Sequence, residues 1–163
     1  MRELSDIDTV GVVGAGTMGS GIAQVAATAG YDVVMRDIED DLVADGFDRI
    51  DDSLSRFVEK EQLSREEADA AVDRISGTTD LDDLAACDYV IEAAVENMEI
   101  KQDIFADLDA AVDDDVILAT NTSTLSITTI ASATERPEFV VGLHFMNPAP
   151  IMEGLELVVG EKT

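Results

Sequence analysis

Short apolar runs alternate with stretches of helical spacing along this chain. Residues 7–13 carry Val-Gly-Val-Val at their centre and predict a strand buried on both faces. Small and apolar side chains over residues 17–29 predict a helix that Gly30 stops, and residues 32–36 predict a second strand. The acidic stretch 39–74 has helical spacing.

That acidic stretch predicts a pair of helices with a break near residues 62–64, because Ser64 and Glu67 form an N-cap pattern. The later part of the chain continues the alternation of strands and helices. Strands are predicted at 89–94, 116–119, 139–143 and 155–159, and helices at 99–112 and 126–133. The pattern predicts an α/β domain with a doubly wound, mostly parallel sheet and a helical arm.

The composition combines a strong excess of acidic residues with an ordinary content of hydrophobic residues. The 163 residues include 36 Asp and Glu against 10 Lys and Arg, a formal net charge of −26, while 46% are hydrophobic. The apolar content predicts a globular domain, and the charge argues against nucleic acid or an anionic membrane as a partner. Few lysines with many aspartates predict a halophilic protein, since concentrated salt screens the self-repulsion.

The compartment is predicted from what the chain does not contain. Cys87 is the single cysteine, so no internal disulfide can form. No apolar run reaches the roughly 18 residues of a membrane span, and residues 1–5 show no basic leader. We therefore expect a cytoplasmic protein.

A glycine motif directly after the first strand indicates a dinucleotide site. Residues 14–19 read Gly-Ala-Gly-Thr-Met-Gly, so Gly14 can make the tight turn, Gly16 can admit a pyrophosphate, and Gly19 can let helix and strand pack closely. The helix N-terminus would then offer amides to phosphate. This context predicts a Rossmann-type domain; a plain βα turn, or a methyltransferase with a similar first turn, are the alternatives.

Asp37 ends the second predicted strand, 21 residues after Gly16. A carboxylate there can accept both ribose hydroxyls and would repel a 2′-phosphate, which favours NAD over NADP. Arg36 should point to the opposite face of its strand. The alternative is that Asp37 is one more solvated carboxylate.

A second group of candidates lies further along the chain. His144 is the only histidine, and its neutral imidazole could take a proton near pH 7. Glu156 falls in a strand that could run beside it and hold its tautomer. Residues 121–124, Asn-Thr-Ser-Thr, follow a strand at the edge where ligands of such sheets bind. The alternatives are a structural histidine and a helix cap at 121–124.

Four motifs in order carry a family resemblance over essentially the whole chain. They are Gly-Ala-Gly-Thr-Met-Gly-Ser-Gly-Ile-Ala from Gly14, Glu-Ala-Ala-Val-Glu-Asn from Glu92, Asn-Thr-Ser from Asn121 and His-Phe-Met-Asn-Pro from His144. The chain resembles the NAD-binding domain of the L-3-hydroxyacyl-CoA dehydrogenases, including the 3-hydroxybutyryl-CoA enzymes. The resemblance implies NAD-dependent oxidation of (S)-3-hydroxyacyl-CoA to 3-oxoacyl-CoA, in fatty-acid β-oxidation or hydroxybutyryl-CoA metabolism, without a metal.

The resemblance also implies roles for individual residues. His144 would be the general base, Glu156 its orienting partner, Ser123 a donor to the substrate oxygen, and Asn147 a neighbour of nicotinamide and substrate. Ser53 and Lys60 would reach the CoA, although a solvated Lys60 is the alternative. The expected cofactor contacts are Gly14, Gly16, Thr17, Met18, Gly19, Asp37, Ala93, Glu96, Lys101 and Asn121.

The resemblance finally bears on domain organisation. Residues 1–163 correspond to the NAD-binding domain, and the helical domain through which these enzymes dimerise and close the substrate cleft would follow Thr163. Two other functions stay open. One is a stand-alone NAD-binding module without turnover, and the other is a dehydrogenase for a hydroxy acid that carries no CoA.

Overall fold

A single seven-stranded sheet organises the chain in the computed structural model, which describes residues 3–163. The strand order is β3-β2-β1-β4-β5-β6-β7, with β1 to β6 parallel and β7 antiparallel to β6. This order confirms the doubly wound, mostly parallel sheet. The strands are β1 (Thr9–Val13), β2 (Asp32–Arg36), β3 (Ile75–Thr78), β4 (Tyr89–Glu92), β5 (Ile117–Thr120), β6 (Val140–Phe145) and β7 (Leu155–Val159).

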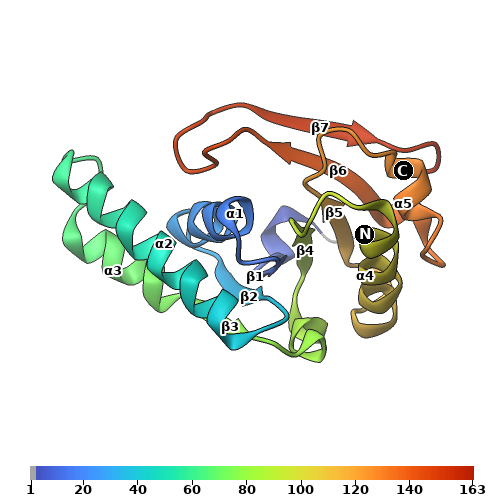
Figure 1. The fold of residues 1–163 in the computed structure, drawn as a ribbon, viewed down its shortest axis with the longest axis horizontal. Helices are drawn as coiled ribbons and strands as arrows, with labels where there is room; N and C mark the ends of the chain where they lie inside the picture. Colours follow the sequence, from blue (N-terminus) through green and yellow to red (C-terminus); the bar gives the residue numbers. More distant parts are fainter. Residues whose placement is uncertain (1–2) are drawn as a thin grey trace.

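Helices connect the parallel strands, as crossovers in such a sheet require. Figure 1 shows the paired α2 and α3 at one end of the molecule and α4 with α5 at the other. The α-helices are α1 (Thr17–Thr28), α2 (Asp40–Glu59), α3 (Arg65–Asp73), α4 (Met98–Ala111) and α5 (Ile127–Ala131). Short 3₁₀ turns, η1 (Leu4–Asp6), η2 (Leu81–Ala86) and η3 (Pro137–Phe139), complete the described elements.

The core divides between the two faces of the sheet. Alternate strand residues such as Val12 and Ile91 pack with α1, α2 and α3, whereas Val90 and Leu118 pack with α4 and α5. Cys87 lies in the second cluster as a free thiol, and burial, aided by the charge of Asp88, raises its pKa to about 12. In the described part of the chain, no helix has the length and apolarity that crossing a bilayer requires.

Several predicted elements are confirmed with close boundaries. The β2 and β7 strands have the predicted limits, and α2 and α3 form the predicted helical arm. The break between them is capped as predicted: Ser64 Oγ accepts a hydrogen bond from the Glu67 amide at 3.1 Å, and Glu67 Oε2 accepts one from the Ser64 amide at 2.8 Å. Those hydrogen bonds lower the pKa of Glu67 below its usual value.

Other boundaries differ from the prediction. The β1 strand begins at Thr9 rather than at residue 7, and β4 ends at Glu92 rather than at 94. The sequence analysis missed β3, because this edge strand buries only Ile75 and pairs with β2 alone. His144 lies within β6 rather than after it, since pairing with β7 continues to Phe145.

The turn between β1 and α1 leaves no room for a side chain at two of its glycines. A Cβ on Gly19 would lie 1.7 Å from the Gly14 carbonyl oxygen, and one on Gly14 would lie 2.7 Å from that of Ala93. Gly14 also has φ of +102°, where a side chain is strained. A Cβ on Gly16, by contrast, would meet no atom within 4 Å.

We expect Gly19→Ala to destabilise the fold by about 3 kcal/mol or more, because the helix must move off the strand to admit a methyl group. The matched change Gly16→Ala should leave stability within about 0.5 kcal/mol, since its Cβ enters open space. Urea unfolding of both variants checks the difference. Equal stabilities would contradict the close packing of α1 on β1.

Candidate active site

The candidate residues follow a row of four aligned residues on neighbouring strands of the sheet. The strand registers align Val13 of β1 with Glu92 of β4, Thr120 of β5 and Gly142 of β6. These residues stand at or near the carboxyl ends of parallel strands, where ligands of open α/β sheets bind. The segments that follow them carry the glycine turn, the 93–97 loop, the 121–124 loop and His144.

The glycine turn leaves the first turn of α1 open to a ligand. No side chain caps the helix at its N-cap residue, Gly16, and Gly16 faces open space. Asp37 Oδ2 accepts a hydrogen bond from the Ala15 amide at 2.7 Å, so the carboxylate is fixed beside the turn. A helix N-terminus with free amides suits an anion, and the space over Gly16 fits the pyrophosphate of a dinucleotide.

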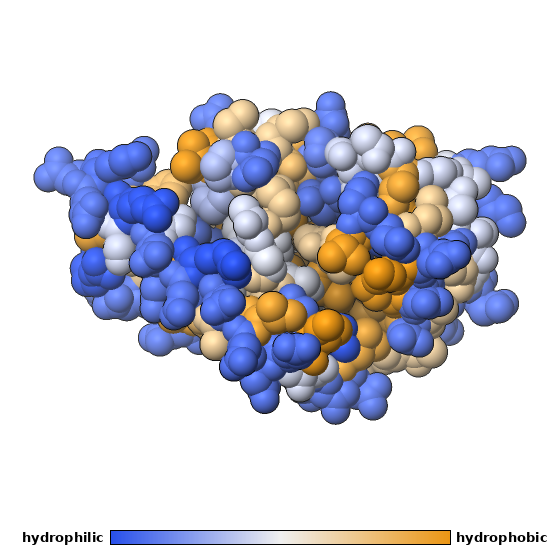
Figure 2. Space-filling view, in the orientation of Figure 1, coloured by the Kyte–Doolittle hydropathy of each residue, from blue (hydrophilic) through white to orange (hydrophobic). Residues whose placement is uncertain are grey.

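Exposed apolar side chains lie on both sides of this turn. Ile38 follows β2 and is 67% exposed, and Val95 follows β4 and is 62% exposed. Figure 2 shows hydrophobic residues gathered near the middle of one face of a largely hydrophilic surface. Because β2 and β4 flank β1, Ile38 and Val95 can form apolar walls for a planar ring. Neither residue was predicted; their signal was an apolar side chain two or three residues after the end of the strand.

A buried ion pair lies beneath the 93–97 loop. Lys101 Nζ lies 2.6 Å from Glu92 Oε1, and the two side chains are 1% and 0% exposed. Glu92 also accepts hydrogen bonds from the Ala94 amide and the Thr120 hydroxyl, both at 2.7 Å. Lys101 was predicted to contact the cofactor, but its ammonium is buried and paired with Glu92.

Glu96 connects this pair to the loop after β5. Its Oε2 lies 3.7 Å from Lys101 Nζ, and its Oε1 accepts hydrogen bonds from the hydroxyls of Thr122 and Thr124. Ser123 stands between those two threonines and is exposed. Hydrogen bonds to Glu96 thus hold the 121–124 loop on either side of Ser123, the predicted substrate contact.

His144 and Glu156 are brought together as predicted. They are directly paired in the β6–β7 register, and His144 Nδ1 lies 2.9 Å from Glu156 Oε2. Asn121 Oδ1 accepts a hydrogen bond from the Phe145 amide at 2.8 Å, which ties the loop after β5 to the histidine strand. Three inter-strand steps of about 4.8 Å, roughly 14 Å in all, separate the glycine turn from the histidine strand.

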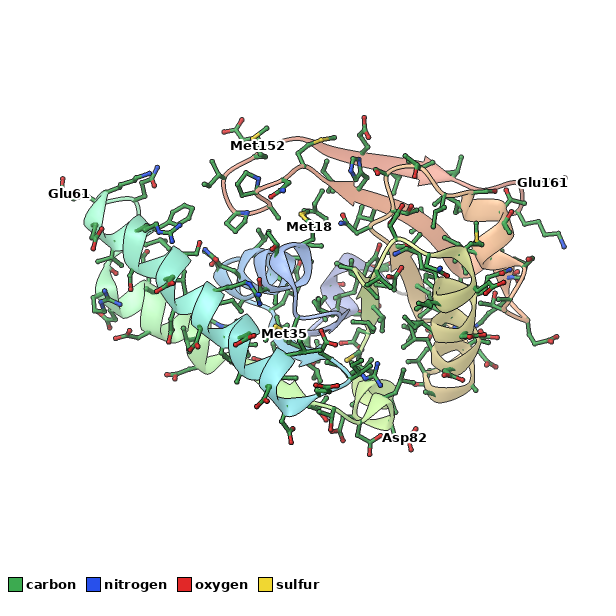
Figure 3. The ribbon with its side chains drawn as sticks, viewed as in Figure 1. Met18, Met35, Glu61, Asp82, Met152 and Glu161 are labelled. Atoms are coloured by element: carbon green, nitrogen blue, oxygen red, sulfur yellow. The ribbon has the colours of Figure 1, made fainter. Side chains whose placement is uncertain are left out.

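The remaining candidates surround this edge. Asn147 is exposed and precedes a cis peptide bond to Pro148. Ser53 and Lys60 line one cavity of about 170 Å³, between the end of α2 and the segment that follows β6. Figure 3 shows Met18 leaving the first turn of α1 on the side toward β6 in that view. Over residues 3–163, no three His, Cys, Asp or Glu side chains are grouped to hold a metal ion.

Comparison with known proteins finds relatives that match almost the whole chain. Residues 9–163 match the family model described as 3-hydroxyacyl-CoA dehydrogenase, NAD binding domain. The chain is 49% identical over 157 residues to the 3-hydroxybutyryl-CoA dehydrogenase of Bradyrhizobium diazoefficiens, covering 96% of this chain and 54% of that protein. It is 46% identical over 153 residues to a probable enzyme of that name from Deinococcus radiodurans, covering 94% and 55%.

A solved structure gives the same result. The crystal structure of (S)-3-hydroxybutyryl-CoA dehydrogenase from Ralstonia eutropha matches with a TM-score of 0.94 and 48% identity, covering 96% of this chain and 56% of that one. The chain therefore spans about half the length of the relatives that it matches.

We expect Lys101→Met to destabilise the fold by about 3 to 5 kcal/mol, because it leaves the Glu92 carboxylate buried without its counter-ion. The double change Lys101→Met with Glu92→Gln should recover most of that loss, since the neutral amide can accept from the Ala94 amide through its oxygen and donate to the Thr120 hydroxyl through its NH2 group. Lys162→Met, at an exposed lysine, is the matched control. Denaturant midpoints of the four proteins check this, and a single variant as stable as the double one would contradict it.

Proposed function

We propose that this chain, which belongs to the 3-hydroxyacyl-CoA dehydrogenase family as an NAD-binding domain, takes part in oxidising (S)-3-hydroxyacyl-CoA to 3-oxoacyl-CoA, in fatty-acid β-oxidation or hydroxybutyryl-CoA metabolism. Its part is to hold NAD across the carboxyl ends of the sheet and to supply the general base. The observation that carries the proposal is His144 paired with Glu156 on the same edge as the glycine turn.

The cofactor is held by the backbone and one carboxylate. The Gly14–Gly19 turn, with Thr17 and Met18, receives the pyrophosphate, and Asp37 receives the adenosine ribose hydroxyls. A 2′-phosphate would meet the charge of Asp37, so NAD is preferred over NADP. Arg36 Nε donates to the Thr79 carbonyl at 3.3 Å, on the loop that follows β3. Further contacts come from the loops after β4 and β5, at Ala93, Glu96 and Asn121, whereas Lys101 of α4 is buried against Glu92 and acts through its neighbour Glu96.

His144 acts as the base through its Nε2. The Glu156 carboxylate accepts from Nδ1, which keeps the proton on that nitrogen and leaves Nε2 as the acceptor for the C3 hydroxyl proton. The same carboxylate stabilises the imidazolium that forms. A base positioned in this way contributes about 10²- to 10⁴-fold to the rate.

The substrate is oriented by polar groups around the histidine. Ser123 donates to the C3 oxygen and Asn147 lies beside the reacting carbon. When bound, NAD accepts the hydride that leaves C3. Ser53 and Lys60 bind the CoA moiety in the cavity at the end of α2, where Arg56 adds a second cation.

The cellular setting follows from the same features. We place the protein in the cytoplasm of a salt-rich cell, on its acidic composition and its single buried cysteine. A helical domain corresponding to the other half of the relatives would close the substrate cleft and form the dimer.

The test is NADH formation from NAD and 3-hydroxybutyryl-CoA. We expect turnover when the chain is combined with the separately produced second half of the Bradyrhizobium relative, and about 10²-fold or greater loss in His144→Asn with unchanged NAD affinity. Gly16→Ala should instead weaken NAD binding, because a methyl group takes the space of the pyrophosphate.

Other outcomes separate the alternatives. Tight NAD binding without turnover in any combination, and without response to acyl-CoA, would indicate a stand-alone NAD-binding module. Equal turnover of a 3-hydroxy acid without the CoA moiety would indicate a different substrate class. Absence of NAD binding by the unmodified chain would refute the proposal as a whole.

We expect the melting temperature to rise with KCl between 0.1 M and molar concentrations, as the Debye length falls from about 10 Å to about 3 Å. Replacing the exposed Asp45, Asp48 and Asp52 of α2 by Asn should raise the melting temperature in dilute buffer and weaken its dependence on salt. Thermal unfolding over a KCl series measures both. A melting temperature that does not respond to KCl would contradict the halophilic assignment.

A further inference from the structure

The Glu92 side chain is fully buried at the carboxyl end of the central strand β4, and both of its carboxylate oxygens accept hydrogen bonds. Its Oε1 contacts Lys101 Nζ at 2.6 Å and the Ala94 amide at 2.7 Å, and its Oε2 accepts from the Thr120 hydroxyl at 2.7 Å. Its own carbonyl oxygen accepts from the Asn121 amide at 2.8 Å. One residue therefore contacts the loop after β4, the end of β5 and helix α4.

Stability alone does not account for this arrangement. Removing two charges from water costs free energy that their attraction often fails to recover, so a well-packed apolar pair is commonly as stable as a buried ion pair. What a buried and fully bonded carboxylate does provide is a fixed geometry, because each partner lost leaves a buried polar group unsatisfied. The partners of Glu92 show which segments of the chain this geometry holds in place.

The partners of Glu92 lead to the loop that carries Ser123. Thr120 lies directly before that loop and is itself fully buried. Lys101 connects Glu92 to Glu96, which binds the hydroxyls of Thr122 and Thr124 on either side of the serine. Two separate routes thus run from the Glu92 carboxylate to the same short segment.

We propose that Glu92 is a positioning residue, which through Thr120 and Lys101 holds the loop after β4 and the Ser123 loop in one fixed relation. The effect of Glu92 on activity rests on the proposed function, in which the first loop lines the cofactor site and the second presents the serine to the substrate. Glu92 touches neither ligand and acts through the backbone that it holds.

Thr120→Val tests this with the least disturbance, because it removes the hydroxyl that bonds Glu92 and keeps charge and side-chain shape. We expect amide hydrogen exchange to rise about tenfold in both residues 93–97 and residues 121–124, because the Thr120 hydroxyl donates to Glu92 and Glu92 in turn accepts from the Ala94 amide of the first loop. Thr120→Ser retains the hydroxyl and should restore the unmodified pattern.

The matched control is Thr134→Val, which removes another buried hydroxyl, bonded at 2.9 Å to the Ala131 carbonyl. It should leave exchange in both loops unchanged. Exchange that rises in 121–124 alone, or in neither loop, overturns the proposal, because the carboxylate would then not couple the two segments.

NAD titration supplies the functional measurement. We expect Thr120→Val to weaken NAD binding about tenfold, with Thr120→Ser and Thr134→Val within about twofold of the unmodified chain. Equal NAD affinity of Thr120→Val and Thr134→Val also overturns the proposal. An unmodified chain that binds no NAD refutes the proposed function, and the exchange comparison alone then decides the coupling by Glu92.

Discussion

The close contact between α1 and the end of β1 determines how the rest of the edge is arranged. With Gly19 against the Gly14 carbonyl, no side chain can separate the helix from the strand. The helix N-terminus therefore opens directly onto the sheet edge, with its amides uncapped. Close packing recurs nearby: a Cβ on Gly46 of α2 would lie 2.9 Å from Ala15, and one on Gly21 of α1 would lie 3.1 Å from Pro150.

Features that depend on local sequence could be predicted. The Gly14–Gly19 motif, the Ser64 cap and the apolar runs each determine their own conformation, because turn, cap and periodicity act within a few residues. The contact of His144 with Glu156 was predictable for a related reason. Two strands close in sequence form a hairpin, and pairing then brings residues twelve positions apart face to face.

Features that depend on packing could not be predicted. The family resemblance implied a cofactor contact for Lys101, and only the contact of α4 with the sheet shows that it is buried against Glu92. Glu92 is also hidden among 36 acidic residues, most of which composition alone would place in solvent. The β3 strand was missed because its pairing with β2, rather than its own apolar content, makes it a strand.

The acidic surface also bears on how such a chain binds an anionic cofactor. The arginines near the glycine turn are engaged with the protein: Arg49 donates to the Ala15 carbonyl and Arg36 to the Thr79 carbonyl, both at 3.3 Å. The uncapped amides and the dipole of α1 attract an anion at this turn without an exposed lysine. Attraction between exposed charges weakens as the Debye length falls to about 3 Å in molar salt, whereas amides in direct contact with phosphate are not separated from it by screening ions. A site built on the backbone thus suits a protein of net charge −26 in concentrated salt better than a site built on exposed lysines.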